Sequence, residues 1–205
     1  MPKSSPASFN GASNKFDRAY YQKFYLNPRR AVTNRAEMQA RAALIAAYVN
    51  HIGCPVSSVL DAGCGIGLLR APLQKLLPRA EYVGLEFSEY LCRRYGWQQG
   101  SLANFQPRRP FELVVCYDVG QYLDDKTASQ AISNLGRLCR GILYFTALTN
   151  EDWRSNCDQR RTDRNVHLRS GAWYNRRLAR HFKRCGAGFW IRRGAPLTVW
   201  EMESG

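Results

Sequence analysis

A glycine-rich loop that begins with an acid is the first feature of this sequence that indicates chemistry. Residues 61–67 read Asp-Ala-Gly-Cys-Gly-Ile-Gly and end a short apolar run at 56–61. Glycines allow positive φ and close approach of a ligand, and a helix after such a loop offers free N–H groups. A dinucleotide fingerprint needs a third glycine where Leu68 stands, which disfavours a nicotinamide or flavin enzyme. The alternative is a turn that serves helix–strand packing alone.

A second acid stands at the end of the next predicted strand. Glu86 follows the strand at 80–85 and lies 19 residues after Gly67. Because the carboxyl ends of parallel strands meet at one edge of a sheet, Glu86 is expected beside the glycine loop. A carboxylate in that position can accept hydrogen bonds from both hydroxyls of a ribose. The loop and Glu86 therefore point to the same ligand site.

The elements that must position these residues alternate between strands and helices. We predict strands at 56–61, 80–85, 96–99, 111–117, 141–148, 187–193 and 197–202, the last two flanking a turn at Gly194-Ala195-Pro196. We predict helices at 36–51, 67–77, 88–95, 126–139 and 172–184, and the aromatic residues at 16–25 recur at helical spacing. This alternation predicts one three-layer α/β domain with a mostly parallel sheet. Residues 150–170 are Arg-rich and show no clear periodicity.

The segments VLDAGCGIG at 59–67 and VGLE at 83–86 resemble the class I S-adenosylmethionine-dependent methyltransferases. The resemblance covers about residues 45–148 and extends more weakly to the C-terminal strands. It implies a Rossmann-like fold with a seven-stranded, mostly parallel sheet, an antiparallel last strand and an N-terminal helical lid. It also implies S-adenosylmethionine as cofactor and S-adenosylhomocysteine as product. The expected organisation is a flexible lead at 1–15 and one methyltransferase domain at 16–205, with the lid at 16–52 and an acceptor-side insertion at 150–172.

The same resemblance places the cofactor in the loops after the first four strands. The glycine loop would contact the methionine part, Glu86 the ribose and Phe87 the adenine. The family's acid after strand three is replaced here by Ser101, whose hydroxyl can still bond to the adenine. Lid tyrosines and an arginine are expected at the methionine carboxylate. The complete expected cofactor set is Tyr21, Tyr25, Arg35, Asp61, Ala62, Gly63, Cys64, Gly65, Gly67, Glu86, Phe87, Ser88, Gly100, Ser101, Leu102, Tyr117, Asp118 and Val119.

Methyl transfer requires positioning of donor and acceptor, and a base only where the acceptor keeps its proton until attack. The sequence does not fix that base; the candidates are Asp118, Tyr122 and His167. The residues expected at the acceptor are Tyr122, Asp152, His167, Trp173 and Tyr174. The acceptor atom, N, O, S or C, stays open.

The formal net charge of +14 is a separate clue, and 24 of the 30 basic residues are arginines. Between Arg154 and Arg193 there are 12 basic residues and two acids, interleaved with aromatic side chains. This pattern suits phosphate contacts and base stacking. It leaves three alternatives: a small-molecule acceptor that is possibly anionic and clamped by Arg160, Arg161, Arg164 or Arg169; a nucleic-acid (RNA) methyltransferase; or a nucleic-acid-binding protein without methyl transfer. Against a base-methylating enzyme, strand four ends in Cys116-Tyr117-Asp118-Val119 and not in the family's N/D-P-P-Y/F motif.

Composition narrows the classes of protein to which this sequence can belong. The sequence has no run of 18 apolar residues and no apolar stretch in residues 1–15, so we expect neither a membrane span nor a secretory signal. The seven cysteines contain no CxxC pair, and the three histidines lack metal-ligand spacing. We therefore expect reduced thiols, no metal and a cytoplasmic monomer or homodimer.

Overall fold

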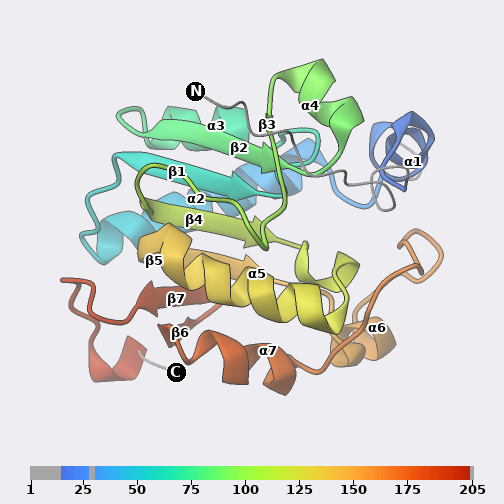
Figure 1. Cartoon of the computed structure of the whole chain (residues 1–205). Helices are drawn as coiled ribbons and strands as arrows, with labels where there is room; N and C mark the ends of the chain where they lie inside the picture. Colours follow the sequence, from blue (N-terminus) through green and yellow to red (C-terminus); the bar gives the residue numbers. More distant parts are fainter. Residues whose placement is uncertain (1–14, 28–30, 204–205) are drawn as a thin grey trace, which may run out of the picture.

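Seven strands form one sheet in the computed structural model, which describes residues 15–27 and 31–203. The strand order is β3-β2-β1-β4-β5-β7-β6. The bounds are β1 Ser58–Ala62, β2 Glu81–Glu86, β3 Gln98–Gln99, β4 Phe111–Tyr117, β5 Cys139–Thr146, β6 Phe182–Gly186 and β7 Phe189–Arg192. The first five strands pair in parallel, whereas β7 is antiparallel to both β5 and β6. The expected Rossmann-like architecture is confirmed (Figure 1).

Helices cover both faces of the sheet and make two apolar cores (Figure 1). Helices α2 (Arg35–His51) and α3 (Arg70–Leu76) pack on one face, and α5 (Asp125–Leu138) and α7 (Gly171–Leu178) on the other. Strand β4 shows why: Leu113 and Val115 enter the first core, while Val114 and Cys116 enter the second. Successive strand residues point to opposite faces, so an unbroken apolar run becomes a strand buried on both sides.

Local signals in the sequence fix the start of several helices. At α2, the Asn34 side chain accepts from the Glu37 N–H at 2.9 Å and the Glu37 carboxylate accepts from the Asn34 N–H at 3.1 Å. This reciprocal capping satisfies two N–H groups that a helix otherwise leaves unpaired. Helix α4 (Glu89–Tyr95) begins after Ser88 and ends at Gly96, which has a φ of 72°. Both ends frame the loop that carries Glu86.

The C-terminal strands differ from the prediction. The predicted helix at 172–184 ends at Leu178, β6 starts at Phe182, and residues 197–202 form no strand; a 3₁₀ turn spans Glu201–Glu203. The hairpin turn lies at Gly186, Ala187 and Gly188, and not at Gly194-Ala195-Pro196. All three turn residues have positive φ, between 47° and 86°. Two glycines make that conformation accessible, and Phe182 is fully buried as a strand residue.

The two segments outside the regular sheet lie at its carboxyl edge. Helix α1 (Arg18–Tyr21) and a π-helical turn (Gln22–Leu26) form the aromatic part of the expected lid, whereas α2 is a core helix with Ala42 and Ile45 fully buried. Helix α6 (Asn150–Ser155), which the sequence did not predict, opens the segment after β5. Residues 1–14 of the expected flexible lead lie outside the described residues.

Three findings concern the cysteines, the possible metal ligands and the possible membrane spans. All seven cysteines are free, and five of them are buried. Within residues 15–27 and 31–203, no cluster of His, Cys, Asp and Glu could hold a metal ion. Among the described helices, none is long and apolar enough to cross a membrane.

Candidate functional site

A cavity of about 1040 Å³ lies where the carboxyl ends of β1, β2, β4 and β5 meet the lid. Its walls come from the glycine loop, from Glu86 and Phe87, and from residues 100–102, 117–124 and 146–148. The lid residues 16–25 and the segment after β5 complete it. Parallel α/β sheets place ligands at this edge. The cavity therefore collects the loops that the sequence singled out.

The glycine loop owes its shape to two close contacts. Gly63 and Gly67 have φ values of 79° and 77°. A Cβ added at Gly63 would lie 2.3 Å from Val119 Cγ2, and one at Gly67 would lie 2.5 Å from the Trp97 ring. Trp97 also donates its indole N–H to the Gly65 carbonyl at 2.9 Å. Trp97, which the sequence analysis did not single out, thus packs against the loop and supports it. Gly67 allows this packing and does not line the cavity.

Asp61 lies behind the loop as a buried acid, 3% exposed. Its Oδ2 accepts a hydrogen bond from the Tyr82 hydroxyl at 2.5 Å. Burial raises the pKa of Asp61 to about 7, although the Tyr82 hydrogen bond opposes that shift. Asp61 therefore titrates near neutral pH, in contact with the cavity wall.

Glu86 is held in place by backbone N–H groups. Its Oε1 accepts from Phe87 and Ser88 at 2.8 and 2.9 Å, and its Oε2 accepts from Gly65 at 2.8 Å. Burial raises its pKa, and these three hydrogen bonds oppose the rise. An ionised carboxylate has about four acceptor positions, so about one remains. Glu86 can thus take one ribose hydroxyl directly, and a second only if the Gly65 contact opens.

Asp118 is the buried acid at the end of β4. It has a φ of 55°, a strained value for a residue with a side chain, and Asp tolerates it better than most. Its Oδ1 accepts from the Thr146 hydroxyl at 3.1 Å. Burial raises the pKa of Asp118, and the hydrogen bonds from Thr146 and Tyr117 and the nearby Arg41 charge oppose the rise. A buried carboxyl with a raised pKa is suited to accept and return a proton.

Arg41 is the basic residue that α2 directs toward this site. Its guanidinium donates to the Tyr144 hydroxyl at 2.5 Å and to the Tyr117 hydroxyl at 3.3 Å, and it lies 4.0 Å from the Tyr117 ring centre. Its Nε is buried and has no hydrogen-bond partner among the described residues. By contrast, Arg35 is exposed at the start of α2 and does not line the cavity. Arg41, and not Arg35, is therefore the α2 arginine that lines the cavity.

The lid closes the cavity with aromatic side chains. The Tyr20 hydroxyl donates to the Tyr122 hydroxyl at 3.1 Å, and Phe16 meets the Tyr122 ring edge-on at 5.5 Å. Burial raises the pKa values of Tyr20, Tyr21, Tyr25 and Tyr122. These phenols stay protonated at neutral pH, which makes Tyr122 a hydrogen-bond donor and a poor base.

Most of the residues expected at the cofactor lie together. Those that line the cavity are Tyr21, Tyr25, Asp61, Gly63, Cys64, Gly65, Glu86, Phe87, Gly100, Ser101, Leu102, Tyr117, Asp118 and Val119. Those outside its lining are Arg35, Ala62, Gly67 and Ser88. Ala62 is fully buried within the core, and Ser88 caps α4 and donates to the Phe16 carbonyl at 2.5 Å. Ala62 thus packs at the end of β1, and Ser88 anchors the lid.

The acceptor-side expectations divide more evenly. Tyr122 and Asp152 line the cavity, but His167, Trp173 and Tyr174 do not. His167 is exposed, whereas Tyr174 is a buried residue of α7 whose hydroxyl accepts from Arg169 at 3.1 Å. Trp173 packs against the Arg177 guanidinium, 3.6 Å from the ring centre. These three side chains lie outside the lining because the chain after residue 163 turns away from the cavity toward α7.

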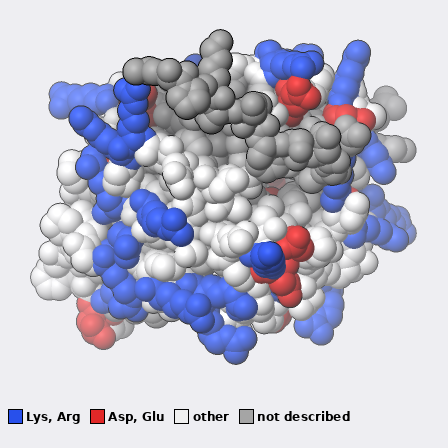
Figure 2. Space-filling model, in the orientation of Figure 1, with Lys and Arg blue, Asp and Glu red and all other residues white. Residues whose placement is uncertain are grey.

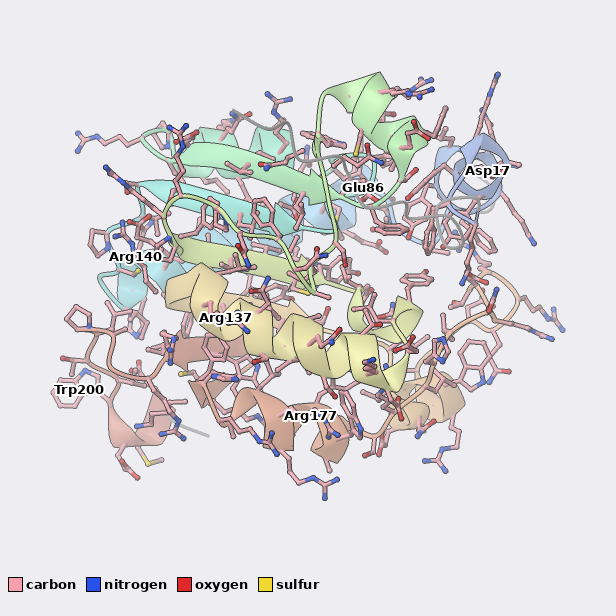
Figure 3. All side chains as sticks on the ribbon, viewed as in Figure 1. Asp17, Glu86, Arg137, Arg140, Arg177 and Trp200 are labelled. Carbon is pink, nitrogen blue, oxygen red and sulfur yellow. The ribbon has the colours of Figure 1, made fainter. Side chains whose placement is uncertain are left out.

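The arginines of the 154–193 segment likewise fall outside the cavity, apart from one. Arg161 lines it and donates to the Ala31 carbonyl, whereas Arg169 is buried and bonds to Asp125 at 2.7 Å and to the Gly120 carbonyl at 3.0 Å. Some of the remaining cations gather around α5 and α7. Figure 2 shows blue side chains across the lower part of the surface, and Figure 3 places Arg137 and Arg177 on those helices, away from Glu86. The α5–α7 basic face, as we define it, consists of Arg137, Arg176, Arg177, Arg180 and Arg192.

Comparisons with known proteins agree with this geometry. Residues 60–141 match the family described as "Methyltransferase domain". No curated protein matches the chain. Among solved structures, magnesium protoporphyrin IX methyltransferase from Synechocystis PCC 6803, with bound SAH, is similar at 18% identity and a TM-score of 0.64, covering 88% of this chain and 97% of that one.

Two further structures show the same fold. DesVI from Streptomyces venezuelae is 18% identical with a TM-score of 0.60, covering 86% of this chain and 98% of that chain. The N-methyltransferase NodS from Bradyrhizobium japonicum WM9, in complex with S-adenosyl-L-homocysteine, is 18% identical with a TM-score of 0.55, covering 80% and 91%. Residues 60–141 thus match a methyltransferase domain, and the chain as a whole shares the Rossmann-like fold of these solved methyltransferases.

Proposed function

We propose that the chain transfers a methyl group from S-adenosylmethionine to a small-molecule acceptor. The observation that carries this proposal is one cavity that contains the glycine loop, the Glu86 carboxylate, the Arg41 guanidinium and the Asp118 carboxylate. Its volume of about 1040 Å³ leaves room for an acceptor beside a nucleoside cofactor.

The residues present fit the cofactor at both of its ends. Arg41 has a buried Nε without a partner among the described residues, which suits the carboxylate of the methionine part. Glu86 has an acceptor position left for a ribose hydroxyl, and Phe87, Ser101 and Leu102 line the wall expected at the adenine. When bound, S-adenosylmethionine supplies a methyl group on a positively charged sulfur.

The remaining residues of the cavity position the acceptor. Tyr20, Tyr25 and Tyr122 form an aromatic wall that excludes water from the reacting groups. We assign to Asp118 the role of accepting the proton that the acceptor loses, because it is the buried cavity carboxyl directly after β4 and its pKa is raised. His167 has no such role in this proposal, because it lies exposed outside the cavity lining.

Calorimetric titration of the full chain with S-adenosylmethionine and S-adenosylhomocysteine tests the proposal. We expect both to bind, and Glu86→Gln to weaken both, since an amide oxygen is a poorer acceptor than a carboxylate. Methyl transfer is then followed with methyl-labelled cofactor and a panel of small acceptors. Absence of binding of either compound at millimolar concentration would overturn the proposal.

The nucleic-acid alternative rests on the α5–α7 basic face. Burial lowers the pKa of Arg177, and the nearby charges of Arg180 and Arg176 lower it further. Like charges held together attract a polyanion. None of the five arginines of this face lines the cavity, however, so a nucleic acid bound there would be separate from the methyl-transfer site.

A further inference from the structure

The cavity carries charge of the opposite sign to the chain. Among the described residues that line it, seven are acids and two are basic, Arg41 and Arg161, in a chain with 30 basic residues and 16 acids. The acids are Asp61, Glu86, Asp118, Asp124, Asp152, Asp158 and Asp163. A cleft lined by one sign of charge concentrates ligands of the other sign. The cavity is therefore built for a cation.

A cationic cofactor accounts for only part of this charge. Asp61 and Glu86 flank the glycine loop, but Asp152, Asp158 and Asp163 belong to the segment after β5. In the sheet, β5 is separated from β1 by β4. These three acids consequently stand on the acceptor side of the cavity, where the cofactor gives no reason for them.

Asp163 shows an unmet demand for a donor. It is 9% exposed and lines the cavity. Its Oδ1 accepts from the Asn165 N–H at 2.9 Å, while its Oδ2 is buried without a hydrogen bond to any described residue. A buried carboxylate oxygen without a donor is costly, which favours a ligand that brings one.

The neighbours of Asp163 complete a site for an ammonium group. The Lys15 ammonium lies 5.3 Å and 5.4 Å from the ring centres of Phe16 and Tyr122, and 3.9 Å from Asp163 Oδ2. Aromatic faces and a carboxylate together are the usual surroundings of a bound ammonium. Lys15 donates its hydrogen bond to the Asn165 carbonyl at 2.6 Å and leaves Oδ2 unbonded. Lys15 therefore occupies the ammonium site but leaves Asp163 Oδ2 without a hydrogen bond.

We propose that the methyl acceptor is an amine whose ammonium group binds beside the rings of Phe16 and Tyr122 and the Asp163 carboxylate, displacing Lys15. Before transfer the ammonium loses one proton to Asp118, the proton acceptor of the proposed function. The freed nitrogen lone pair then forms the N–C bond while the C–S bond of the cofactor breaks, which gives the methylated ammonium and S-adenosylhomocysteine. This inference rests on the proposed methyltransferase function and names its substrate class. An anionic acceptor finds fewer partners, because Arg161 is bonded to the Ala31 carbonyl and Arg41 serves the cofactor. The amine need not be identified to test the charge preference.

The first test compares three ligands of similar shape and different charge. The full chain is saturated with S-adenosylhomocysteine, and calorimetry then measures the affinities of 2-phenylethylamine, 2-phenylethanol and 3-phenylpropanoate. We expect the amine to bind at least about tenfold more tightly than the alcohol, because it gains a charge-assisted hydrogen bond and cation–π contacts. Equal or tighter binding of the alcohol or the acid, or no binding of the amine, overturns the inference. S-adenosylhomocysteine is titrated first, so its failure to bind separately signals failure of the proposed function.

Two variants and a matched control locate the preference. Asp163→Asn should abolish most of the amine-over-alcohol preference, because the amide keeps the Oδ1 acceptor for Asn165 but removes the charge. Lys15→Gln should increase the preference, because it removes the competing ammonium. Glu89→Gln, an acid-to-amide change on α4 outside the cavity lining, should leave it unchanged. An unchanged preference in Asp163→Asn, or a reduced one in Lys15→Gln, would show that Asp163 and the rings only latch the lid.

Discussion

The cavity and the α5–α7 basic face solve opposite electrostatic problems within one chain. The cavity gathers seven acids against two arginines among its described lining residues, while the basic face gathers Arg137, Arg176, Arg177, Arg180 and Arg192 on and beside helices α5 and α7. The net charge of +14 thus reflects the basic surface of the chain and not the cavity, whose charged lining residues are mostly acids. A ligand inferred from net charge alone would have the wrong sign.

Burial disfavours the charged form in both regions, but it acts on groups of opposite sign. In the cavity, burial raises the pKa values of Asp61, Glu86 and Asp118, so the acids hold their protons more strongly. On the basic face, burial and neighbouring arginines lower the pKa values of Arg177 and His181. Substitutions in the cavity should accordingly change chemistry and binding, and substitutions on the face should change neither.

The largest effect is expected from Asp118→Asn. Loss of the proton acceptor should reduce methyl transfer about 100-fold or more, while S-adenosylhomocysteine affinity stays close to that of the unchanged chain. Asn tolerates the φ of 55° and keeps an oxygen for the Thr146 hydroxyl, so the fold should persist. Single-turnover rates with an accepted substrate measure the effect. Parallel losses of rate and cofactor affinity would instead assign Asp118 to cofactor binding.

Arg41→Met should produce the next largest effect, on affinity. We expect S-adenosylhomocysteine to bind about tenfold or more weakly, because one charged donor to its carboxylate is lost. Methionine fills much of the space beside Tyr117 and Tyr144. Arg180→Met, at an exposed position just after α7, is the matched control and should leave the affinity unchanged. Similar affinity losses in both variants would erase the distinction between cavity and face.

The sequence predicted the cavity better than it predicted the acceptor side. The apolar run at 111–117 became β4 with the same bounds, and the glycine loop and Glu86 lie together, because both depend on local patterns. Arg41 was missed although its spacing from Met38 and Ile45 puts it on the buried face of α2, where a charge is unusual. The position of a charged residue on the buried face of this helix could therefore have been recognised from the sequence.

Other features could not be read from spacing. The ammonium site joins Lys15 and Phe16 to Tyr122 and Asp163, residues that come together only when the lid meets the segment after β5. The C-terminal hairpin was misplaced because two turn candidates compete there, Gly186-Ala187-Gly188 and Gly194-Ala195-Pro196. The stacking of Phe189 on Tyr48 at 3.9 Å, a long-range contact, favours the first. Such contacts lie beyond local propensity.

Asp61→Asn should change how stability depends on pH. Burial raises the pKa of Asp61 from 3.8 to about 7, so the folded chain holds this proton where the unfolded chain has lost it. The stability that this group contributes is fully present below about pH 4 and is lost as pH rises through about 7. Urea unfolding over this range should show that the unchanged chain loses stability relative to Asp61→Asn. Glu89→Gln, a surface change, should show no such trend, and a parallel pair of curves for Asp61→Asn would contradict the raised pKa.

The smallest effect on catalysis is expected from the triple substitution Arg137→Gln, Arg176→Gln and Arg180→Gln, all at exposed positions. Methyl transfer to a small acceptor and cofactor affinity should change by less than about twofold, since screened surface charges act weakly over distance. The same variant decides the nucleic-acid alternative, because each phosphate contact with a single strand adds about −0.7 to the slope of log affinity against log salt. Gel shifts with single-stranded RNA over a series of salt concentrations measure that slope. A steep slope that the triple variant removes would make the basic face a polyanion site, whereas a shallow slope shared by both proteins would leave the cavity as the site of function.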